Sequence, residues 1–205
     1  TSDSENRDND MHFALTDEQQ LIVDTVRNFV ENEIYPHENS VEKSGQVPKE
    51  LGQDIAAKCK EIGFFASNIS AEFGGGGLNQ LEFSLLEREL GRGSMGLTVF
   101  FGRPSGILEA CEGDQIENYL LPAVRGEKYD ALAMTEPAAG SDVRGMQCTA
   151  TQDGDDWIIN GTKHFISHAD IANFVIVFVA TGQEETPRGV KKKISCFLVD
   201  RGMPG

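Results

Sequence analysis

The segment Ala133-Met-Thr-Glu-Pro-Ala-Ala-Gly-Ser-Asp142 lies just after the point where the sequence pattern changes from helices to strands. Its first residues are typical of a strand, which breaks at Pro137 into a loop of small and hydroxylated residues. Such a loop lets backbone amides and hydroxyl groups approach a flat polar ring or a phosphate closely. An ordinary exit from a strand gives the same pattern, so this segment alone leaves both interpretations open.

Upstream of this segment the pattern is helical, from Leu15 to about Val124. Thr16 and Gln19 match a capping box, and apolar residues behind them recur at three- and four-residue spacing. A first helix is expected from Thr16 to Pro36, which would close it. Further helices are expected from Pro48 to Gly63 and from Asn79 to Gly91. Two shorter helices are expected over residues 105–111 and 114–121, and Pro122 would end the second of these.

Downstream of Gly126 the signals change to short strands separated by turns. Strands are expected at residues 129–134, 148–151, 157–159, 163–166, 174–179 and 194–199, with hairpin turns at 153–156 and at Asn160-Gly161. Helices followed by strands predict an α+β protein, since βαβ units would alternate them. We expect a disordered acidic tail over residues 1–10, an α-helical domain over 11–126 and a β-domain over 127–205.

Composition excludes several function classes. The 205 residues contain 18 Lys and Arg against 33 Asp and Glu, a net charge of −15, which argues against nucleic acid and anionic membrane surfaces as partners. No apolar run is long enough for a transmembrane helix, and the first ten residues lack the pattern of a signal peptide. The four cysteines are scattered, which favours a reduced intracellular protein.

Four familiar motifs are present only in part. Gly91–Gly96 has the G-x-G-x-x-G spacing of a dinucleotide site, but a helix and not a strand precedes it. Residues 74–77 are all glycine without the Lys-Ser/Thr of a phosphate loop, and a flexible connection is expected there. His164 and His168 have a metal-ligand spacing only on a helix, whereas a strand and turn are expected. Ser141 is not in a nucleophile elbow, and the chain offers it no assigned base.

Several ordered motifs resemble the acyl-CoA dehydrogenase family over residues 11–205, nearly the whole chain. The most specific is Met134-Thr-Glu-Pro-Ala-Ala-Gly-Ser-Asp142, followed by Trp157-Ile-Ile-Asn-Gly-Thr-Lys163 and Phe165-Ile-Ser167. The helical half agrees through Leu15-Thr-Asp-Glu-Gln-Gln20, Glu61-Ile-Gly-Phe64, Glu72-Phe-Gly-Gly75, Glu87-Arg-Glu-Leu-Gly91 and Tyr119-Leu-Leu-Pro122. The resemblance implies an N-terminal all-α domain, then an antiparallel β-barrel or sandwich-like middle domain, truncated before a C-terminal helical bundle.

The resemblance also implies a FAD site. Its residues would be Leu132, Met134, Thr135, Gly140, Ser141, Phe165, Ile166 and Ser167, with Ser141 also touching the acyl-CoA substrate. The family's second flavin segment is normally Trp-Ile-Thr. Here Phe165 keeps an aromatic face but loses the indole donor, and Ser167 keeps the hydroxyl.

The implied reaction is α,β-dehydrogenation of an acyl-CoA to a trans-2-enoyl-CoA, with electrons passed to an electron-transferring flavoprotein. The family's catalytic glutamate would lie beyond Gly205, so no residue of this chain is assigned as the base, and no metal is expected. Family members assemble as homodimers or homotetramers in fatty-acid metabolism, and we expect a bacterial cytoplasmic protein first and a mitochondrial matrix protein second. An acyl-CoA oxidase or related flavin monooxygenase, and a non-catalytic acyl-CoA- or protein-binding module, stay open as alternatives.

Overall fold

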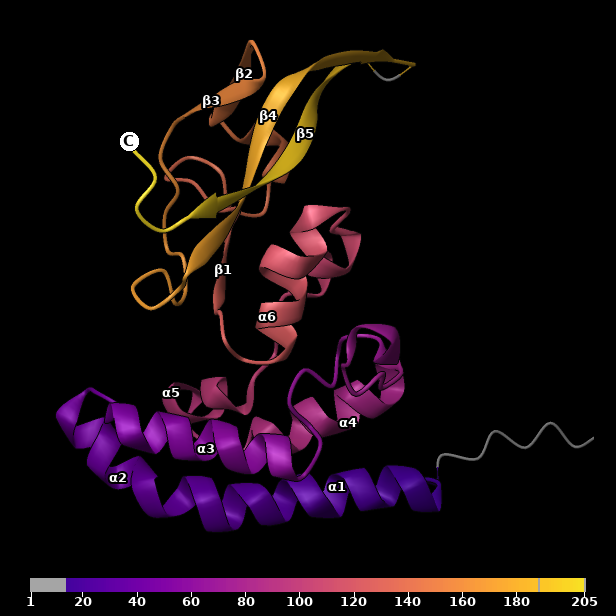
Figure 1. The fold of residues 1–205 in the computed structure, drawn as a ribbon, viewed down its shortest axis with the longest axis vertical. Coiled ribbons are helices and arrows are strands. Elements are labelled where there is room, and N and C mark those ends of the chain that lie inside the picture. The colour runs from indigo at the N-terminus through magenta and orange to yellow at the C-terminus, as the bar shows by residue number, and fades with distance from the viewer. Residues whose placement is uncertain (1–13, 188, 205) are drawn as a thin grey trace, which may run out of the picture. The chain divides into compact units, whose positions relative to one another are not determined.

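The structure is a computed structural model that describes residues 14–187 and 189–204 (Figure 1). The acidic tail expected over residues 1–10 lies outside the described residues. The helices longer than one turn are α1 (Asp17–Phe29), α2 (Tyr35–Ser44), α3 (Lys49–Glu61) and α4 (Gln80–Leu90). The short ones are α5 (Met95–Thr98) and α6 (Leu121–Val124), with π-helical turns at Val30–Ile34 and Ile116–Leu120 and 3-10 turns at Ala71–Phe73, Val99–Phe101, Gly106–Ala110 and Val143–Gly145.

The described residues form two compact units. Residues 14–58 and Leu78–Phe101 make a helical unit, and Cys59–Gly77 with Gly102 onward make a unit that contains the sheet. The boundary between them falls inside α3, because Lys58 and Cys59 belong to different units. The division at residue 126 follows the change of sequence pattern and stays a prediction.

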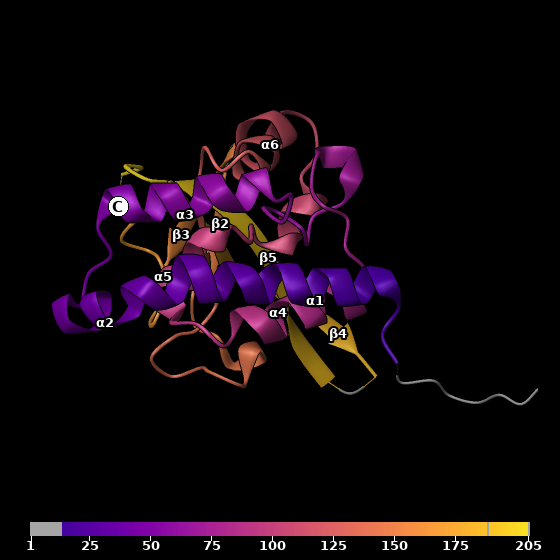
Figure 2. The same ribbon diagram turned by 90° about the horizontal axis from the view of Figure 1, so that it is seen from below.

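In the helical unit, α1 begins as its sequence predicts. The Thr16 hydroxyl accepts a hydrogen bond from the Gln19 amide at 3.2 Å, and the Gln19 side chain accepts one from the Thr16 amide at 3.1 Å. The buried side chains of α1 include Ile22, Val26 and Phe29, and α4 packs beside α1 (Figure 2). The Phe29 ring also meets Phe101 edge-on, with 5.2 Å between ring centroids.

The prediction that Pro36 closes the first helix is wrong. The chain continues through the π-helical turn Val30–Ile34 into α2, in whose first turn Pro36 lies. Proline is accommodated there because the first amides of a helix need no acceptor within it. Pro122 is the same case: it lies in the first turn of α6 and does not end a helix as predicted.

The second unit contains a five-stranded sheet, made of β1 (Asp130–Ala133), β2 (Thr149–Asp153), β3 (Asp156–Asn160), β4 (Phe174–Thr186) and β5 (Gly189–Asp200). The path β1-β4-β2-β3 is hydrogen-bonded in that order, and β5 pairs with β4 as a long antiparallel ribbon (Figure 1). The order of helices before strands is therefore confirmed.

The sheet is mixed, whereas antiparallel strands were expected. β4 pairs in parallel with β1 and, at Thr149 and Ala180, with β2. Parallel pairing needs a long connection between the strands, and the segment that carries β2 and β3 supplies it between β1 and β4. The hairpin turn at 153–156 is confirmed, since Asp153 pairs with Asp156.

The strand predicted over residues 163–166, and with it the hairpin at Asn160-Gly161, is absent. Residues 162–164 form no ladder, and Phe165 has a positive φ of 55°, which interrupts a strand. Gly161 instead lets the chain pass Cys148, because a Cβ there would lie 2.3 Å from the Cys148 sulfur.

One face of this sheet is covered by helical turns of the same unit. Phe174 and Ile176 of β4 are fully buried in a cluster with Leu108 and Leu120 from two of these turns. Tyr119 meets Phe174 edge-on, at 4.9 Å between ring centroids. β1 pairs with β4 in this sheet, and the chain leaves β1 into the loop of residues 134–141.

Candidate functional site

A buried carboxylate organises the loop that follows β1. Glu136 is only 4% exposed. Its Oε1 accepts hydrogen bonds from the Cys148 amide at 3.0 Å and from Lys163 Nζ at 2.8 Å, and its Oε2 accepts one from the Gln147 amide. We call Glu136, Lys163 and these two amides the Glu136 junction. It joins three segments that are far apart in the sequence.

The junction keeps Glu136 ionised. Burial by itself would raise the pKa of this carboxyl group, but the hydrogen bonds from Lys163, Gln147 and Cys148 outweigh burial and lower its pKa to about 2. The partner Lys163 is also withdrawn from water, with 10% of its side chain exposed. A charged pair this buried depends on its full set of hydrogen bonds.

The same lysine brings the two predicted flavin segments together. Lys163 Nζ donates a second hydrogen bond to the Met134 carbonyl at 2.9 Å, and the His164 amide donates to the Thr135 carbonyl at 2.9 Å. Residues 163–164 are thereby held against residues 134–135. A tight turn follows, in which Glu136 and Ala139 exchange backbone hydrogen bonds at 2.9 and 3.2 Å.

The predicted cofactor residues of the first segment lie along this junction. Leu132 of β1 is 41% exposed, Met134 and Thr135 are half-buried, and Gly140 and Ser141 are exposed after the tight turn. A Cβ added at Gly140 would meet nothing within 4 Å, so the backbone there is open to a ligand. The side chain of Ser141 has no hydrogen-bond partner among the described residues.

The second segment presents its aromatic ring outward. Phe165 is 83% exposed, and His164 stacks on it with 3.8 Å between ring centroids and 12° between the ring planes. Ile166 is half-buried, and Ser167 is exposed with no partner for its hydroxyl in the described part of the chain. The structure brings the backbones of the two segments together at residues 134–135 and 163–164. Among the predicted side chains, Phe165 stacks on His164, whereas the hydroxyl groups of Ser141 and Ser167 have no partner in the described part of the chain.

These features fit a planar ring such as the isoalloxazine of FAD. Phe165 and Leu132 expose apolar area, and the hydroxyl groups of Ser141 and Ser167 have no partner in the described part of the chain. Ligand sites combine exposed apolar area with a few polar groups of this kind.

Sequence reasoning missed the Glu136 junction, although both of its charged residues lie in the quoted motifs. Glu136 and Lys163 are 27 positions apart, and nothing local pairs them. The signal that was available is chemical: the first motif carries the negative charges of Glu136 and Asp142 among small and apolar residues, and the second carries the positive charge of Lys163.

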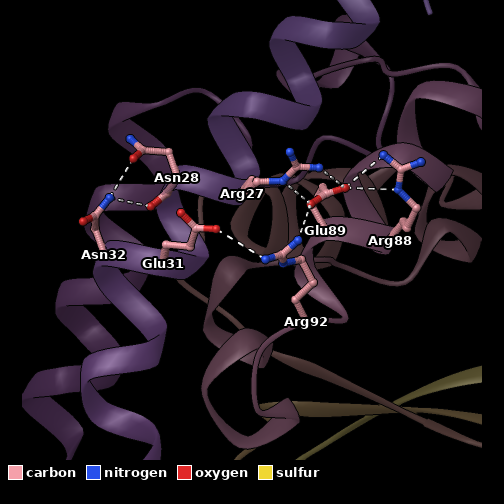
Figure 3. A network of polar contacts seen from close by, with 7 residues as sticks. All are labelled: Arg27, Asn28, Glu31, Asn32, Arg88, Glu89 and Arg92. Atoms are coloured by element: carbon pink, nitrogen blue, oxygen red, sulfur yellow. Dashed lines mark hydrogen bonds and ion pairs between the residues drawn. The ribbon is translucent and has the colours of Figure 1, made fainter. Parts of the chain in front are cut away.

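A second buried carboxylate, Glu89, was also missed and lies in the helical unit (Figure 3). Its side chain is 3% exposed and pairs with Arg27 at 3.0 Å, Arg88 at 2.9 Å and Arg92 at 3.7 Å. Glu31 extends the network through Arg92 at 3.3 Å. The hydrogen bond from Arg27 is the main reason why the pKa of Glu89 is lowered, against the effect of burial. This network connects α1 to α4 and is structural.

The glycine run has a packing reason. A Cβ at Gly75 would lie 2.2 Å from the Ile69 carbonyl oxygen, and one at Gly76 would lie 2.8 Å from Ser67 Cα. These glycines therefore permit close backbone contact within their own unit, which a side chain would prevent. In the described part of the chain no group of three or more His, Cys, Asp or Glu residues is placed to hold a metal ion, and no helix there is long and apolar enough to cross a membrane.

Comparison with known proteins supports the resemblance. The family model for the acyl-CoA dehydrogenase N-terminal domain matches residues 16–127, and the model for the middle domain of the same family matches residues 131–205. The benzylmalonyl-CoA dehydrogenase of Aromatoleum aromaticum is 36% identical over 200 residues, which cover 95% of this chain and 50% of that protein. A caffeyl-CoA reductase-Etf complex subunit of Acetobacterium woodii is 33% identical over 196 residues, covering 93% of this chain and 50% of its own length.

A solved structure described as the FAD complex of PigA is similar in fold, with a TM-score of 0.77 and 30% identity. The match covers 95% of this chain and 51% of that one. The chain thus spans about half the length of the curated relatives it matches. With matching models over both its helical and its strand-rich part, this chain belongs to the acyl-CoA dehydrogenase family.

Proposed function

We propose that this chain forms the N-terminal portion and part of the flavin-binding portion of a FAD-dependent acyl-CoA dehydrogenase. The reaction is α,β-dehydrogenation of an acyl-CoA thioester, with electrons passed to an electron-transferring flavoprotein. The partner is supported by the Acetobacterium woodii relative, whose name places it in a complex with such a protein. Assembly as a homodimer or homotetramer belongs to the same proposal.

The observation that carries the proposal is the joining of two distant segments. Hydrogen bonds from Lys163 and His164 to the carbonyls of Met134 and Thr135 hold residues 163–167 beside residues 132–141. Together the segments leave the largely exposed ring of Phe165, the exposed side chain of Leu132, and two hydroxyl groups that have no partner among the described residues, all within one unit.

Each residue has a proposed task toward FAD. Phe165 and Leu132 would pack against the ring, and the backbone at Met134, Thr135, Gly140 and Ile166 would offer it hydrogen-bonding groups. Ser167 would donate a hydrogen bond to a ring nitrogen, while Ser141 would contact both the flavin and the acyl-CoA. FAD, when bound, supplies the acceptor for the hydride that leaves the β-carbon of the acyl chain.

No carboxylate of this chain is proposed as the base that removes the α-proton. Glu136 is the nearest to the flavin segments, but both of its oxygens already accept hydrogen bonds, and its low pKa makes it a weak base. We place the base outside these 205 residues, as the family resemblance implies.

Titration of the chain with FAD, followed residue by residue by NMR, tests the site. We expect shifts at residues 132–141 and 165–167 and a dissociation constant above micromolar, because only part of the family's flavin contacts lie on this chain. Phe165→Ala should weaken binding further, whereas Tyr129→Ala, an exposed aromatic residue of the same unit, should not. Shifts confined to other residues would contradict the proposed site.

A second test separates the dehydrogenase from the oxidase alternative. In the protein assembled with its remaining portion, the substrate-reduced flavin should be reoxidised rapidly by an electron-transferring flavoprotein and slowly by dioxygen. Rapid reoxidation by dioxygen would favour an acyl-CoA oxidase or a related monooxygenase of the same fold.

A further inference from the structure

The loop that joins β3 to β4 contains two residues with a strained backbone. Phe165 has a φ of 55° and His168 a φ of 63°, a region that residues other than glycine adopt uncommonly. The second proposed flavin segment, residues 165–167, therefore begins at one strained residue and ends just before the other. Such conformations persist only where the surrounding structure holds them. The Glu136 junction holds the chain before the segment, because it ties residues 163–164 to residues 134–135.

The chain after the segment is held by a single arginine. Arg201 Nε donates a hydrogen bond to the Ala172 carbonyl at 2.7 Å. Its Nη2 donates to the carbonyls of Ala169 and Asp170 at 3.0 and 2.7 Å. We call these three hydrogen bonds the Arg201 clamp. They connect the residue that follows β5 to a turn that directly follows the flavin segment.

The clamp closes on a turn that is bonded back to the flavin segment. The His168 carbonyl accepts hydrogen bonds from the amides of Ile171 at 3.1 Å and Ala172 at 2.9 Å. The Ala169 amide donates to the Ile166 carbonyl at 3.5 Å, the longest bond of this set. A shift of the clamped carbonyls would therefore move His168 and the end of the segment with them.

Arg201 is itself fixed by the sheet. It follows Asp200, the last residue of β5, and its amide donates to the Asn173 carbonyl at 2.9 Å. The Asn173 amide donates to the Tyr129 carbonyl at 2.7 Å, and its side-chain oxygen accepts from the Tyr129 amide at 2.8 Å. These contacts lie where β1 and β4 begin and β5 ends, so the clamp refers the turn to three strands.

The clamp depends on the shape of the guanidinium group. Two of its nitrogens donate to three different carbonyls, which suits a planar fork with donors in fixed directions. A lysine carries all its donors on one nitrogen and does not reproduce that geometry. Arg201 forms no ion pair with any residue in the described part of the chain, so these backbone carbonyls are the partners of its side chain.

We propose that Arg201 is a positioning residue for the flavin, because it holds the turn of residues 168–172 so that Ser167 presents its hydroxyl group to the ring. The inference rests on the proposed function, which assigns to Ser167 a hydrogen bond to a ring nitrogen. Arg201 acts through the backbone of the turn. Since Arg201 is exposed, its replacement leaves the buried core unchanged.

The first readout is amide hydrogen exchange of the 205-residue chain, measured by NMR without FAD. Arg201→Gln should accelerate the exchange of the Ile171 and Ala172 amides by about tenfold, because their hydrogen bonds belong to the clamped turn. Arg201→Lys keeps the charge and should give the same acceleration. The matched control is Arg125→Gln, which removes an exposed arginine of the same unit that pairs with Glu127 and should leave both amides unchanged.

The second readout is the midpoint potential of the flavin in the FAD-loaded protein, assembled with its remaining portion. Arg201→Gln and Arg201→Lys should each lower this potential, as Ser167→Ala should. The double variant of Arg201→Gln and Ser167→Ala should lower it no further than Ser167→Ala does alone, because both changes remove the same contact. A general loss of stability would not produce this dependence on Ser167.

The outcomes separate the clamp from the function on which it rests. Unchanged exchange in Arg201→Gln, or normal exchange in Arg201→Lys, would overturn the clamp. Faster exchange with an unchanged potential, or a shift of the potential that does not depend on Ser167, would overturn its role toward the flavin. Failure of the proposed function is read separately, from the absence of FAD-induced shifts at residues 132–141 and 165–167 of the wild-type chain.

Discussion

Replacement of Glu136 by glutamine tests whether the Glu136 junction holds the proposed flavin segments in place. The substitution keeps the shape of the side chain but replaces one oxygen by an NH2 group and removes the charge. The new NH2 group is a donor and then faces other donors, either the Gln147 amide or the Cys148 amide and the Lys163 ammonium. Lys163 stays charged without an ionised partner. The loss of stability comes from these unpaired groups.

The magnitude follows from the pKa of this carboxyl group. Lowering the pKa from its ordinary value of 4.5 to about 2 corresponds to about 3 kcal/mol of stabilisation of the ionised form. Breaking a buried pair by removing one partner costs about 3–5 kcal/mol, which agrees. We therefore expect Glu136→Gln to lower the free energy of unfolding by about 3 kcal/mol at pH 7.

The assay is urea unfolding followed by the fluorescence of Trp157. It is the one tryptophan of the chain, lies on β3 and meets Phe197 edge-on at 5.5 Å, so it reports on the unit that contains Glu136. Glu127→Gln is the matched control, since its pair with Arg125 is exposed and its loss should leave the free energy of unfolding close to the wild-type value. A loss below about 1 kcal/mol for Glu136→Gln would refute the reasoning.

Acid gives the same prediction a second readout. Because the pKa of Glu136 is lowered on folding, its contribution is present above the ordinary value of 4.5 and is lost as the pH falls through about 2. The difference in unfolding free energy between the wild-type chain and Glu136→Gln should therefore be constant at neutral pH and shrink between pH 4.5 and pH 2. A difference that stays constant over that range would show that another group causes the destabilisation.

Three further predictions concern other parts of the chain. Glu89→Gln should destabilise the helical unit by about 1–3 kcal/mol, because the buried carboxylate pairs with three arginines that can return to water. Unfolding followed by circular dichroism at 222 nm measures this loss, and no change would contradict a stabilising network. Asn79→Ala should cost about 1 kcal/mol in the same assay, since its side chain caps the Leu81 and Glu82 amides at 3.0 and 3.1 Å, and an unchanged midpoint would exclude that role. Ser167→Ala, in the protein assembled with its remaining portion, should lower the flavin midpoint potential, because a donor to the reduced ring worth roughly 1.5–3 kcal/mol is lost; an unchanged potential would remove Ser167 from the site.

The helix starts and stops were largely predictable, because they depend on local chemistry. The capping box predicted at Thr16 is formed, and Asn79, where the third helix was expected to begin, is the N-cap of α4. The errors at Pro36 and Pro122 have one cause: proline ends a helix from within but is accepted in a first turn, and the sequence alone does not say where the new turn begins. A π-helical turn before each proline is what lets the chain continue.

The strand pairing was less predictable, because it depends on contacts between distant residues. The hairpin at 153–156 is local and was found, whereas the parallel pairing of β1 with β4 joins residues more than 40 positions apart. Asn160-Gly161 has the composition of a hairpin turn, but Gly161 serves a close approach to Cys148. The sequence pattern therefore indicated that a glycine is required at position 161, but it did not indicate that the requirement is close contact with Cys148.

The position of Glu136 shows why a buried carboxylate beside a proposed active site need not be catalytic. A general base near neutral pH needs a free oxygen and a raised pKa, and burial without partners provides both. Glu136 is buried but has three donors on its two oxygens, so the sign of its pKa shift is reversed. Its burial instead strengthens the hydrogen bonds through which Lys163 also reaches the Met134 carbonyl. The charge in the Thr-Glu-Pro motif thus serves to position the loop: it fixes the backbone on which Thr135, Gly140 and Ser141 are presented.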